Sequence, residues 1–121
     1  MRKNMKLGVG LLTVLATPVV INTVDSNEVQ AEYRGQVFYH LNKPANWWHS
    51  DGQDWYFFKD GRKYTGWGKD NAGEKYFANG KYANWWYDDG SDWYFFKDGR
   101  KYTGWGKDNA GEHYYVNGKY A

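Results

Sequence analysis

The sequence contains no cysteine, which excludes disulfide bonds, cysteine-ligated zinc and thiol catalysis. Aliphatic side chains are almost as scarce after residue 31, where the only Val, Leu and Ile residues are Val37, Leu41 and Val116. A conventional aliphatic core is therefore excluded, and so is a two-domain enzyme, because domains usually run to about 100 residues or more. The net charge is also small, at +2. This disfavours nucleic acid as the main partner, because that binding depends on a strong positive field.

Aromatic residues take the place of the missing aliphatics. The chain has 8 Trp, 12 Tyr and 6 Phe, and all of them lie after residue 31. Each buried ring removes roughly 150–250 Å² from water, so the rings can supply the apolar area that a core needs. So few aliphatic residues would otherwise suggest a disordered chain, but the aromatic rings compensate for them.

Residues 1–31 have the pattern of a secretory signal peptide. Three basic residues lie within the first six positions, and an uncharged, mostly apolar run follows over residues 7–21. This run is shorter than the ~20 residues of a membrane-spanning helix, and Ala31 ends a stretch that fits the small-residue rule for cleavage. We therefore expect cleavage before Glu32, and a secreted chain, extracellular or associated with the cell wall, with no membrane span after cleavage. A retained membrane anchor is the alternative.

The rest of the chain is an internal repeat. Residues 46–83 and 84–121 match at 32 of 38 positions, and residues 32–45 precede them as an N-terminal half-unit or cap. A finer 19-residue period, called the short period below, divides each repeat into two units, so that four units follow the half-unit. The recurring positions are Trp48, Trp67, Trp86 and Trp105; Asp51, Asp70, Asp89 and Asp108; Gly61, Gly80, Gly99 and Gly118; and the pairs Phe57-Phe58, Tyr76-Phe77, Phe95-Phe96 and Tyr114-Tyr115.

The composition of one unit favours strands and turns, because aromatic residues prefer strands and Gly, Asn and Asp prefer turns. We predict a strand over residues 54–58, an Asp-Gly turn at 59–61 and a return strand over 62–67, with 49–53 as a connecting loop. A lone hairpin is marginal in water, whereas stacked hairpins can share one aromatic interior. The predicted fold is therefore all-β, a solenoid of stacked β-hairpins.

The aromatic positions divide into core and surface. The first ring of each recurring pair is predicted to lie in the core: Phe57, Tyr76, Phe95 and Tyr114. Trp55 and Trp93 differ, because the short period places Glu74 and Glu112 at their counterparts. A core position does not readily exchange Trp for Glu, since an unpaired buried carboxylate is costly. We therefore expect Trp55 and Trp93 to be at least partly exposed, as in a recognition surface.

One unit carries a recognisable motif: Trp48, then Trp55-Tyr56-Phe57, then Gly61, then Thr65-Gly66-Trp67. This motif resembles the choline-binding type of cell-wall-binding repeat, found on surface proteins and lytic enzymes of Gram-positive bacteria and their phages. The glucan-binding repeats of secreted bacterial glucosyltransferases look similar. The resemblance covers about residues 38–121 and implies a β-hairpin solenoid.

The resemblance also implies which side chains bind the ligand. In the family, the cage is built from the first Trp of a hairpin, its closing Trp and an aromatic residue of the next hairpin. Carried over, this pairs Trp55 with Trp67 and Trp93 with Trp105, and adds two equivalent closing tryptophans, Trp48 and Trp86.

Three features differ from the family pattern, and the first is a turn that is one residue shorter. Lys63 and Lys101, or Tyr82 and Tyr120, stand where the family usually has Met, and Glu residues replace the cage Trp in alternate units. A Lys beside an aromatic cage can fill it with its own cation or repel a quaternary ammonium. The ligand is therefore left open between a choline-like group, a cell-wall polysaccharide and a teichoic acid.

Other chemistry finds little support in the sequence. Ser50 beside His49 has no evident third member of a catalytic triad, and His113 does not recur with the repeat. The acidic stretches 70–74 and 88–92 do not keep the spacing of a calcium loop, and Asp and Asn beside Gly are typical of tight turns. We therefore expect no enzyme, no metal site and no cofactor.

These observations predict a secreted, non-catalytic cell-wall-binding repeat protein that recognises envelope polysaccharide or choline-like groups through exposed aromatic side chains. One alternative is a bacteriocin-like antibacterial effector that targets the cell wall. A second is a self-assembling surface protein, a homo-oligomer formed through the C-terminal hairpin, whose edge would pair between chains.

Overall fold

The computed structural model describes residues 22–23 and 29–121, which belong to two compact units. The first unit ends at Tyr64 and the second runs from Thr65 to Ala121. Within the described ranges all regular secondary structure is β-strand, so the predicted all-β class is confirmed. No helix in these ranges is long and apolar enough to span a membrane. The predicted signal peptide lies mostly outside the described residues.

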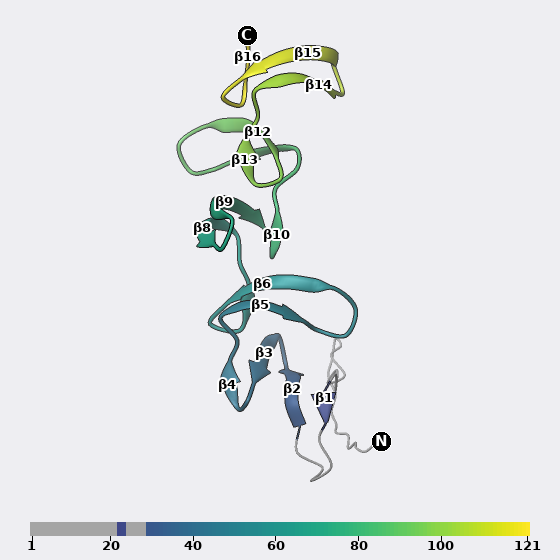
Figure 1. Cartoon of the computed structure of the whole chain (residues 1–121), viewed down its shortest axis with the longest axis vertical. Coiled ribbons are helices and arrows are strands. Elements are labelled where there is room, and N and C mark those ends of the chain that lie inside the picture. Colours follow the sequence, from purple (N-terminus) through teal and green to yellow (C-terminus); the bar gives the residue numbers. More distant parts are fainter. Residues whose placement is uncertain (1–21, 24–28) are drawn as a thin grey trace. The chain divides into compact units, whose positions relative to one another are not determined.

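The first unit contains two antiparallel sheets (Figure 1). The four-stranded sheet has the order β1-β2-β3-β4, with β1 at Asn22–Thr23, β2 at Val29–Arg34, β3 at Val37–His40 and β4 at Lys43–Pro44. The three-stranded sheet has the order β5-β6-β7, with β5 at Trp47–Ser50, β6 at Trp55–Lys59 and β7 at Arg62–Lys63. The predicted cleavage point after Ala31 falls within β2.

The second unit contains three antiparallel sheets of three strands each. The first consists of β8 (Gly66–Asp70), β9 (Gly73–Ala78) and β10 (Lys81–Tyr82). The next consists of β11 (Trp86–Asp88), β12 (Trp93–Lys97) and β13 (Arg100–Lys101), and the last of β14 (Gly104–Asp108), β15 (Gly111–Val116) and β16 (Lys119–Tyr120). The middle strand of each sheet pairs with both of its neighbours along the chain.

The predicted turns are confirmed, whereas the predicted return strand is wrong. Asp60 and Gly61 connect β6 to β7 with φ angles of 52° and 80°, the two positive values of a type I′ hairpin turn. The return strand β7 ends at Lys63, and Trp67 belongs to the next sheet, in β8. The chain leaves the β6–β7 ladder after Lys63, and β8 begins at Gly66, whose φ of 139° is a conformation that side-chain-bearing residues rarely adopt. The predicted loop 49–53 likewise begins within β5, so each unit of the repeat is a three-stranded sheet.

Aromatic rings stack between successive sheets inside each compact unit, at a sequence separation one longer than the short period. Phe38 stacks on Phe58 at 4.8 Å in the first unit, and Tyr76 stacks on Phe96 at 4.9 Å in the second. Both Phe58 and Phe96 are buried. At ~25 cal/mol per Å², a buried ring of roughly 150–250 Å² contributes about 4–6 kcal/mol of gross burial free energy. These stacks supply the apolar core that aliphatic residues do not.

The core prediction holds for three of its four positions. Phe57, Tyr76 and Phe95 are buried, as predicted, but Tyr114 is 40% exposed, and its neighbour Tyr115 is fully buried instead. The reason lies in the stacking rule, because the first ring of a pair is covered by the second ring of the next pair. Phe95 is covered in this way by Tyr115 at 4.3 Å, whereas the Tyr114 ring makes an edge contact with the exposed Trp105 at 5.4 Å.

Three of the turn glycines that recur with the short period, Gly61, Gly99 and Gly118, bring their turns against a strand of the preceding sheet. In the first unit, the Gly61 N–H donates to the Ala45 carbonyl at 2.8 Å, and its carbonyl accepts from the Phe38 N–H at 2.7 Å. A Cβ at Gly61 would lie 2.3 Å from Val37 Cγ1 and 3.0 Å from the Phe38 carbonyl. The turn therefore docks backbone to backbone, and a side chain at this position would prevent it.

Candidate functional site

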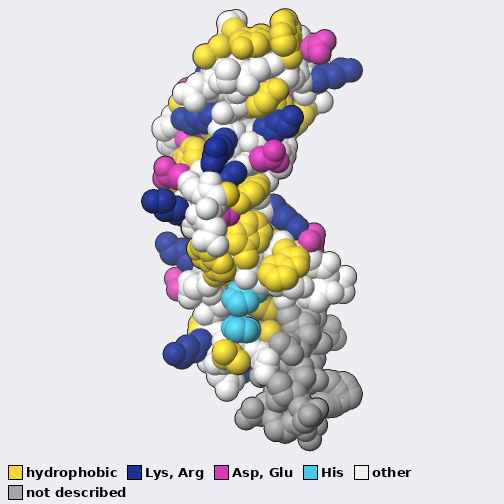
Figure 2. Space-filling model, viewed as in Figure 1, with side chains coloured by type: hydrophobic (Ala, Val, Ile, Leu, Met, Phe, Trp, Pro, Cys, Tyr) yellow, Lys and Arg dark blue, Asp and Glu magenta, His cyan; other side chains and the backbone are white. Residues whose placement is uncertain are grey.

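Three tryptophans have more than half of their surface exposed. Trp55 begins β6 and is 58% exposed, Trp93 begins β12 and is 56% exposed, and Trp105 in β14 is 64% exposed. The backbone N–H of Trp55 or Trp93 donates to the preceding carboxylate, Asp54 or Asp92, at 2.8 Å, which fixes the chain where the indole leaves the sheet. The predicted exposure of Trp55 and Trp93 is confirmed. On the face drawn in Figure 2, basic and acidic side chains are interspersed among hydrophobic ones.

The other three predicted ligand residues, Trp48, Trp67 and Trp86, are half-buried. The indole N–H of Trp67 donates to Asp89 at 3.2 Å, and that of Trp86 donates to Asp108 at 3.0 Å. In both cases the aspartate belongs to the following sheet or the loop within it, so these two indoles help to hold successive sheets together. Their role in ligand binding stays a prediction.

The aspartates that accept these bonds are held in the charged form. Hydrogen bonds from the hydroxyl and the backbone N–H of Ser91 are the main cause of a pKa at Asp89 well below the usual value. The pKa of Asp108 is lowered chiefly by the hydrogen bond from the Tyr120 hydroxyl, at 2.6 Å. The aspartate that recurs with the short period therefore accepts hydrogen bonds from its own sheet and from the neighbouring sheet.

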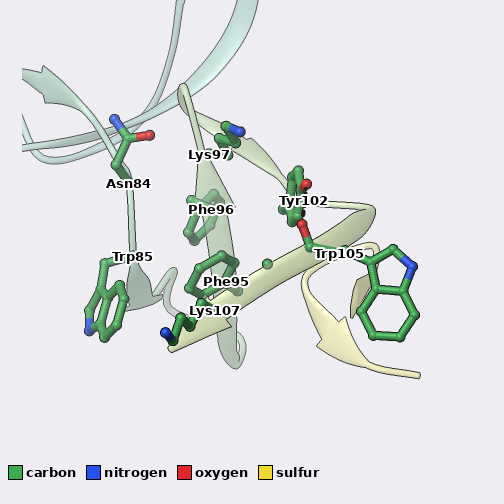
Figure 3. A pocket seen from close by; sticks show the side chains of 9 residues that line it. Asn84, Trp85, Phe95, Phe96, Lys97, Tyr102, Trp105 and Lys107 are labelled. Carbon is green, nitrogen blue, oxygen red and sulfur yellow. Dashed lines mark hydrogen bonds between the residues drawn. The ribbon is translucent and has the colours of Figure 1, made fainter. Parts of the chain in front are cut away.

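A surface pocket of about 280 Å³ lies in the second unit (Figure 3). Phe95 and Phe96 lie between two exposed indoles, Trp85 and Trp105. The Tyr102 hydroxyl donates to the Trp105 carbonyl at 2.6 Å and so fixes the backbone at one end. The full lining is Asn84, Trp85, Phe95, Phe96, Lys97, Tyr102, Trp105, Gly106 and Lys107.

The chemistry of this lining is that of a binding site. It supplies aromatic faces, two ammonium groups and one amide. Exposed rings pack against the apolar C–H faces of sugars, and ammonium groups bind anionic substituents. A volume near 280 Å³ is at the lower end for small-molecule sites, so the pocket suits one small unit of a larger polymer.

The pocket brings together tryptophans that the sequence did not pair. Trp105 and Trp85 both line it, and the pairing of Trp93 with Trp105 in ligand binding stays a prediction. Trp55 belongs to the first compact unit and Trp67 to the second, and their pairing in ligand binding stays a prediction. Trp85, which is 39% exposed, was missed by the sequence reasoning, as were the two pocket lysines.

The lysines that replace the family's Met lie over tyrosine rings of their own sheet. The ammonium of Lys63 is 3.8 Å from the ring centroid of Tyr56, and that of Lys101 is 3.7 Å from the centroid of Tyr94. Each contact contributes ~0.5–1 kcal/mol at an exposed site. These tyrosine faces are therefore already occupied by a cation of the chain itself.

A pair of histidines lies in the first unit. His40 in β3 and His49 in β5 have ring centroids 4.5 Å apart. Burial, and to a lesser extent the neighbouring His40, lower the pKa of His49 from its usual value of 6.5. His49 is thus half-buried in a strand rather than part of a polar loop.

Comparison of the chain with protein-family models, with curated proteins and with solved structures finds no match in any of the three. The resemblance to cell-wall-binding repeats stays a prediction that depends on the motif residues alone. In the described part of the chain, no group of three or more His, Asp or Glu residues is placed to hold a metal ion.

Proposed function

We propose that this chain is a secreted, non-catalytic protein that binds the bacterial cell wall, recognising envelope polysaccharide or choline-like groups through exposed aromatic side chains. The observation that carries the proposal is the exposure of Trp55, Trp93 and Trp105, each more than half accessible on a chain whose core is built from other rings. Large exposed indoles are costly to leave in water, and they are typical of recognition surfaces.

The repeat adds multivalency to the proposal. The 38-residue repeat places Trp55 and Trp93, and also Trp47 and Trp85, at equivalent positions, so the chain carries two copies of these exposed rings. Two weak contacts on one insoluble polymer raise the apparent affinity by roughly 10²–10⁴ over a single contact, provided that both can engage at once. A shallow aromatic groove can then hold the chain on the wall.

The test is retention of the chain on purified envelope fractions, with choline, glucan and teichoic acid as soluble competitors. Trp55→Ala/Trp93→Ala should weaken retention about tenfold or more while the fold is kept, since each exposed recognition Trp contributes at least ~1 kcal/mol. Phe57→Ala is the matched control, because Phe57 is buried in the same strand and its loss costs about 3–5 kcal/mol of folding free energy.

Circular dichroism separates the two effects. The proposal predicts a native spectrum for the Trp variant and a destabilised one for Phe57→Ala. Retention of the Trp variant equal to that of the unchanged chain would refute the role of these indoles. Failure of the unchanged chain to bind any envelope fraction would refute the function.

A further inference from the structure

The pocket between Trp85 and Trp105 carries two positive charges. Lys97 ends β12 and Lys107 lies in β14, and both exposed side chains line the pocket (Figure 3). Among the residues that the structure describes, neither ammonium is in an ion pair. The ammonium of Lys97 lies 5.3 Å from the ring centroid of Tyr102, at the outer limit of a cation–π contact. The pocket thus combines flat rings with two cations that can bind an anion.

The acidic residues nearest to these lysines along the chain do not line the pocket. Asp98 and Asp108 follow the lysines in sequence, and Glu112 is the cross-strand neighbour in the β14–β15 ladder, but none belongs to the lining. Asp108 is committed to hydrogen bonds with tyrosine and indole groups. The amide of Asn84 is also committed, accepting from the Asp98 N–H at 2.8 Å and donating to a backbone carbonyl at 3.2 Å. The lining is therefore locally positive on a nearly neutral chain.

A cationic ligand is disfavoured at the other aromatic face of this unit as well. The ammonium of Lys101 lies 3.7 Å from the Tyr94 ring centroid and 5.9 Å from that of Trp67. A quaternary ammonium would have to displace this internal cation or approach it closely. Both the pocket and the aromatic face beside Lys101 therefore repel a choline-like group, and the pocket attracts an anion.

We infer that the pocket selects an anionic saccharide, a sugar unit joined through a phosphodiester, with the sugar against Trp85 or Trp105 and the phosphate between Lys97 and Lys107. This inference rests on the proposed wall-binding function and names its ligand class. Lysine ammonium groups bind phosphate as point charges, whereas the paired recognition of a carboxylate favours an arginine fork, and no arginine lines the pocket. Binding of this kind weakens as salt screens the exposed charges.

The experiment compares the full chain on cell walls before and after treatment with aqueous hydrogen fluoride, which cleaves phosphodiesters and leaves the carboxylate-bearing peptidoglycan. The expected result is retention on untreated walls, loss of most of that retention after treatment, and a steady decrease as sodium chloride is raised from about 50 mM to about 500 mM. Equal retention on treated walls would overturn the phosphodiester assignment and leave the wall-binding function standing. Absence of retention on either kind of wall would be a failure of the proposed function itself.

Variants then assign the effect to the pocket. Lys97→Ala/Lys107→Ala should weaken retention on untreated walls on the order of tenfold, from roughly threefold for each exposed charge contact. Lys97→Arg/Lys107→Arg should restore most of it, because the charge is kept. Lys43→Ala/Arg62→Ala removes the same charge from exposed positions of the first unit and should bind like the unchanged chain. Equal losses for the pocket pair and this control pair would overturn the pocket assignment.

Discussion

Replacement of Gly99 by alanine tests whether the recurring turn glycine is needed for close approach or only for its backbone conformation. Gly99 lies in the turn between β12 and β13 with φ +79°. Its N–H donates to the Ala83 carbonyl at 2.9 Å, and its carbonyl accepts from the Tyr76 N–H at 2.7 Å. A Cβ there would lie 3.0 Å from both Cβ and Cδ of Lys75 and 3.3 Å from the Tyr76 carbonyl. The turn must therefore separate from β9, or Lys75 must shift.

Gly90 provides the matched control in the same unit. Its φ is +100°, and a Cβ there would have no atom within 4 Å. Alanine at either position takes up a conformation that costs about 1–2 kcal/mol, and only Gly99→Ala adds overpacking, which costs about 1–3 kcal/mol. We therefore expect a loss of about 2–5 kcal/mol for Gly99→Ala and about 1–2 kcal/mol for Gly90→Ala.

The assay is urea unfolding followed by near-ultraviolet circular dichroism and tryptophan fluorescence, with free energies from midpoints at constant m value. Gly118→Ala is a second test variant, because its Cβ would lie 2.9 Å from Tyr94 Cβ, and it should resemble Gly99→Ala. If Gly90→Ala destabilises the chain as much as Gly99→Ala does, the glycine is required for conformation alone and the docking explanation is refuted.

Two predictions concern pH. The pKa of Asp108 is lowered in the fold, so its hydrogen bonds stabilise the chain above the usual aspartate pKa of 3.8, and this contribution is lost as the pH falls below that value. Asp108→Asn should therefore be less stable than the unchanged chain at about pH 7, with a smaller difference at about pH 2.5, as measured by urea midpoints; an equal difference at both pH values would contradict this. The pKa of His49 is also lowered, so the unfolded chain binds more protons, and stability should fall as the pH drops from about 7.5 to about 5. His49→Tyr, which introduces the residue of the second repeat, should flatten that fall in the thermal midpoint, and the same substitution at His40 should flatten it less.

The short period was enough to predict the turns and the exposed tryptophans. Asp-Gly between two aromatic strands predicted a hairpin, and the exchange of Trp55 for Glu74 predicted an exposed ring. The same argument, applied one step further, would have found the missed pocket residue. The glycine counterparts of Trp47 and Trp85 in the next unit are Gly66 and Gly104, and a position that exchanges Trp for Gly is not part of a repeating core.

Which ring of the last pair is buried could not be predicted in the same way. Tyr114 and Tyr115 are both aromatic, and the short period treats them as it treats the earlier pairs. The first ring of a pair is buried when the second ring of the next pair stacks on it. This is a contact between sheets, and it cannot be recognised from the positions that recur with the short period. The pocket lysines were also beyond reach, because Lys97 and Lys107 are far apart until β12 and β14 come together.

The cation–π pairs of lysine and tyrosine occupy two fixed positions in three of the three-stranded sheets. Lys75 and Tyr82 form a cation–π contact at 4.4 Å in the sheet between those of Lys63 and Lys101, with the order of cation and ring reversed. The last sheet places His113 against Tyr120 at 4.1 Å. In each of these sheets the two positions lie seven residues apart in the sequence. The residues at these positions change from sheet to sheet, but each of these sheets retains a favourable contact between them.

The structural positions and two pairs of exposed tryptophans follow two different periods. The positions that hold the sheets together, which are the turn glycine, the second ring of the pair and the acceptor aspartate, recur with the short period. Two pairs of exposed tryptophans recur only with the full repeat, Trp47 with Trp85 and Trp55 with Trp93, whereas the exposed Trp105 belongs to a set that recurs with the short period. A structural requirement must be met in every sheet, because inside each compact unit a ring of one sheet stacks on a ring of the sheet before it. A binding surface needs a ring only where the ligand reaches it, so the sheets between carry Gly66 or Glu74 there without loss to the core. The longer period therefore marks the positions at which wall-binding variants should be designed first, which are Trp47, Trp55, Trp85 and Trp93.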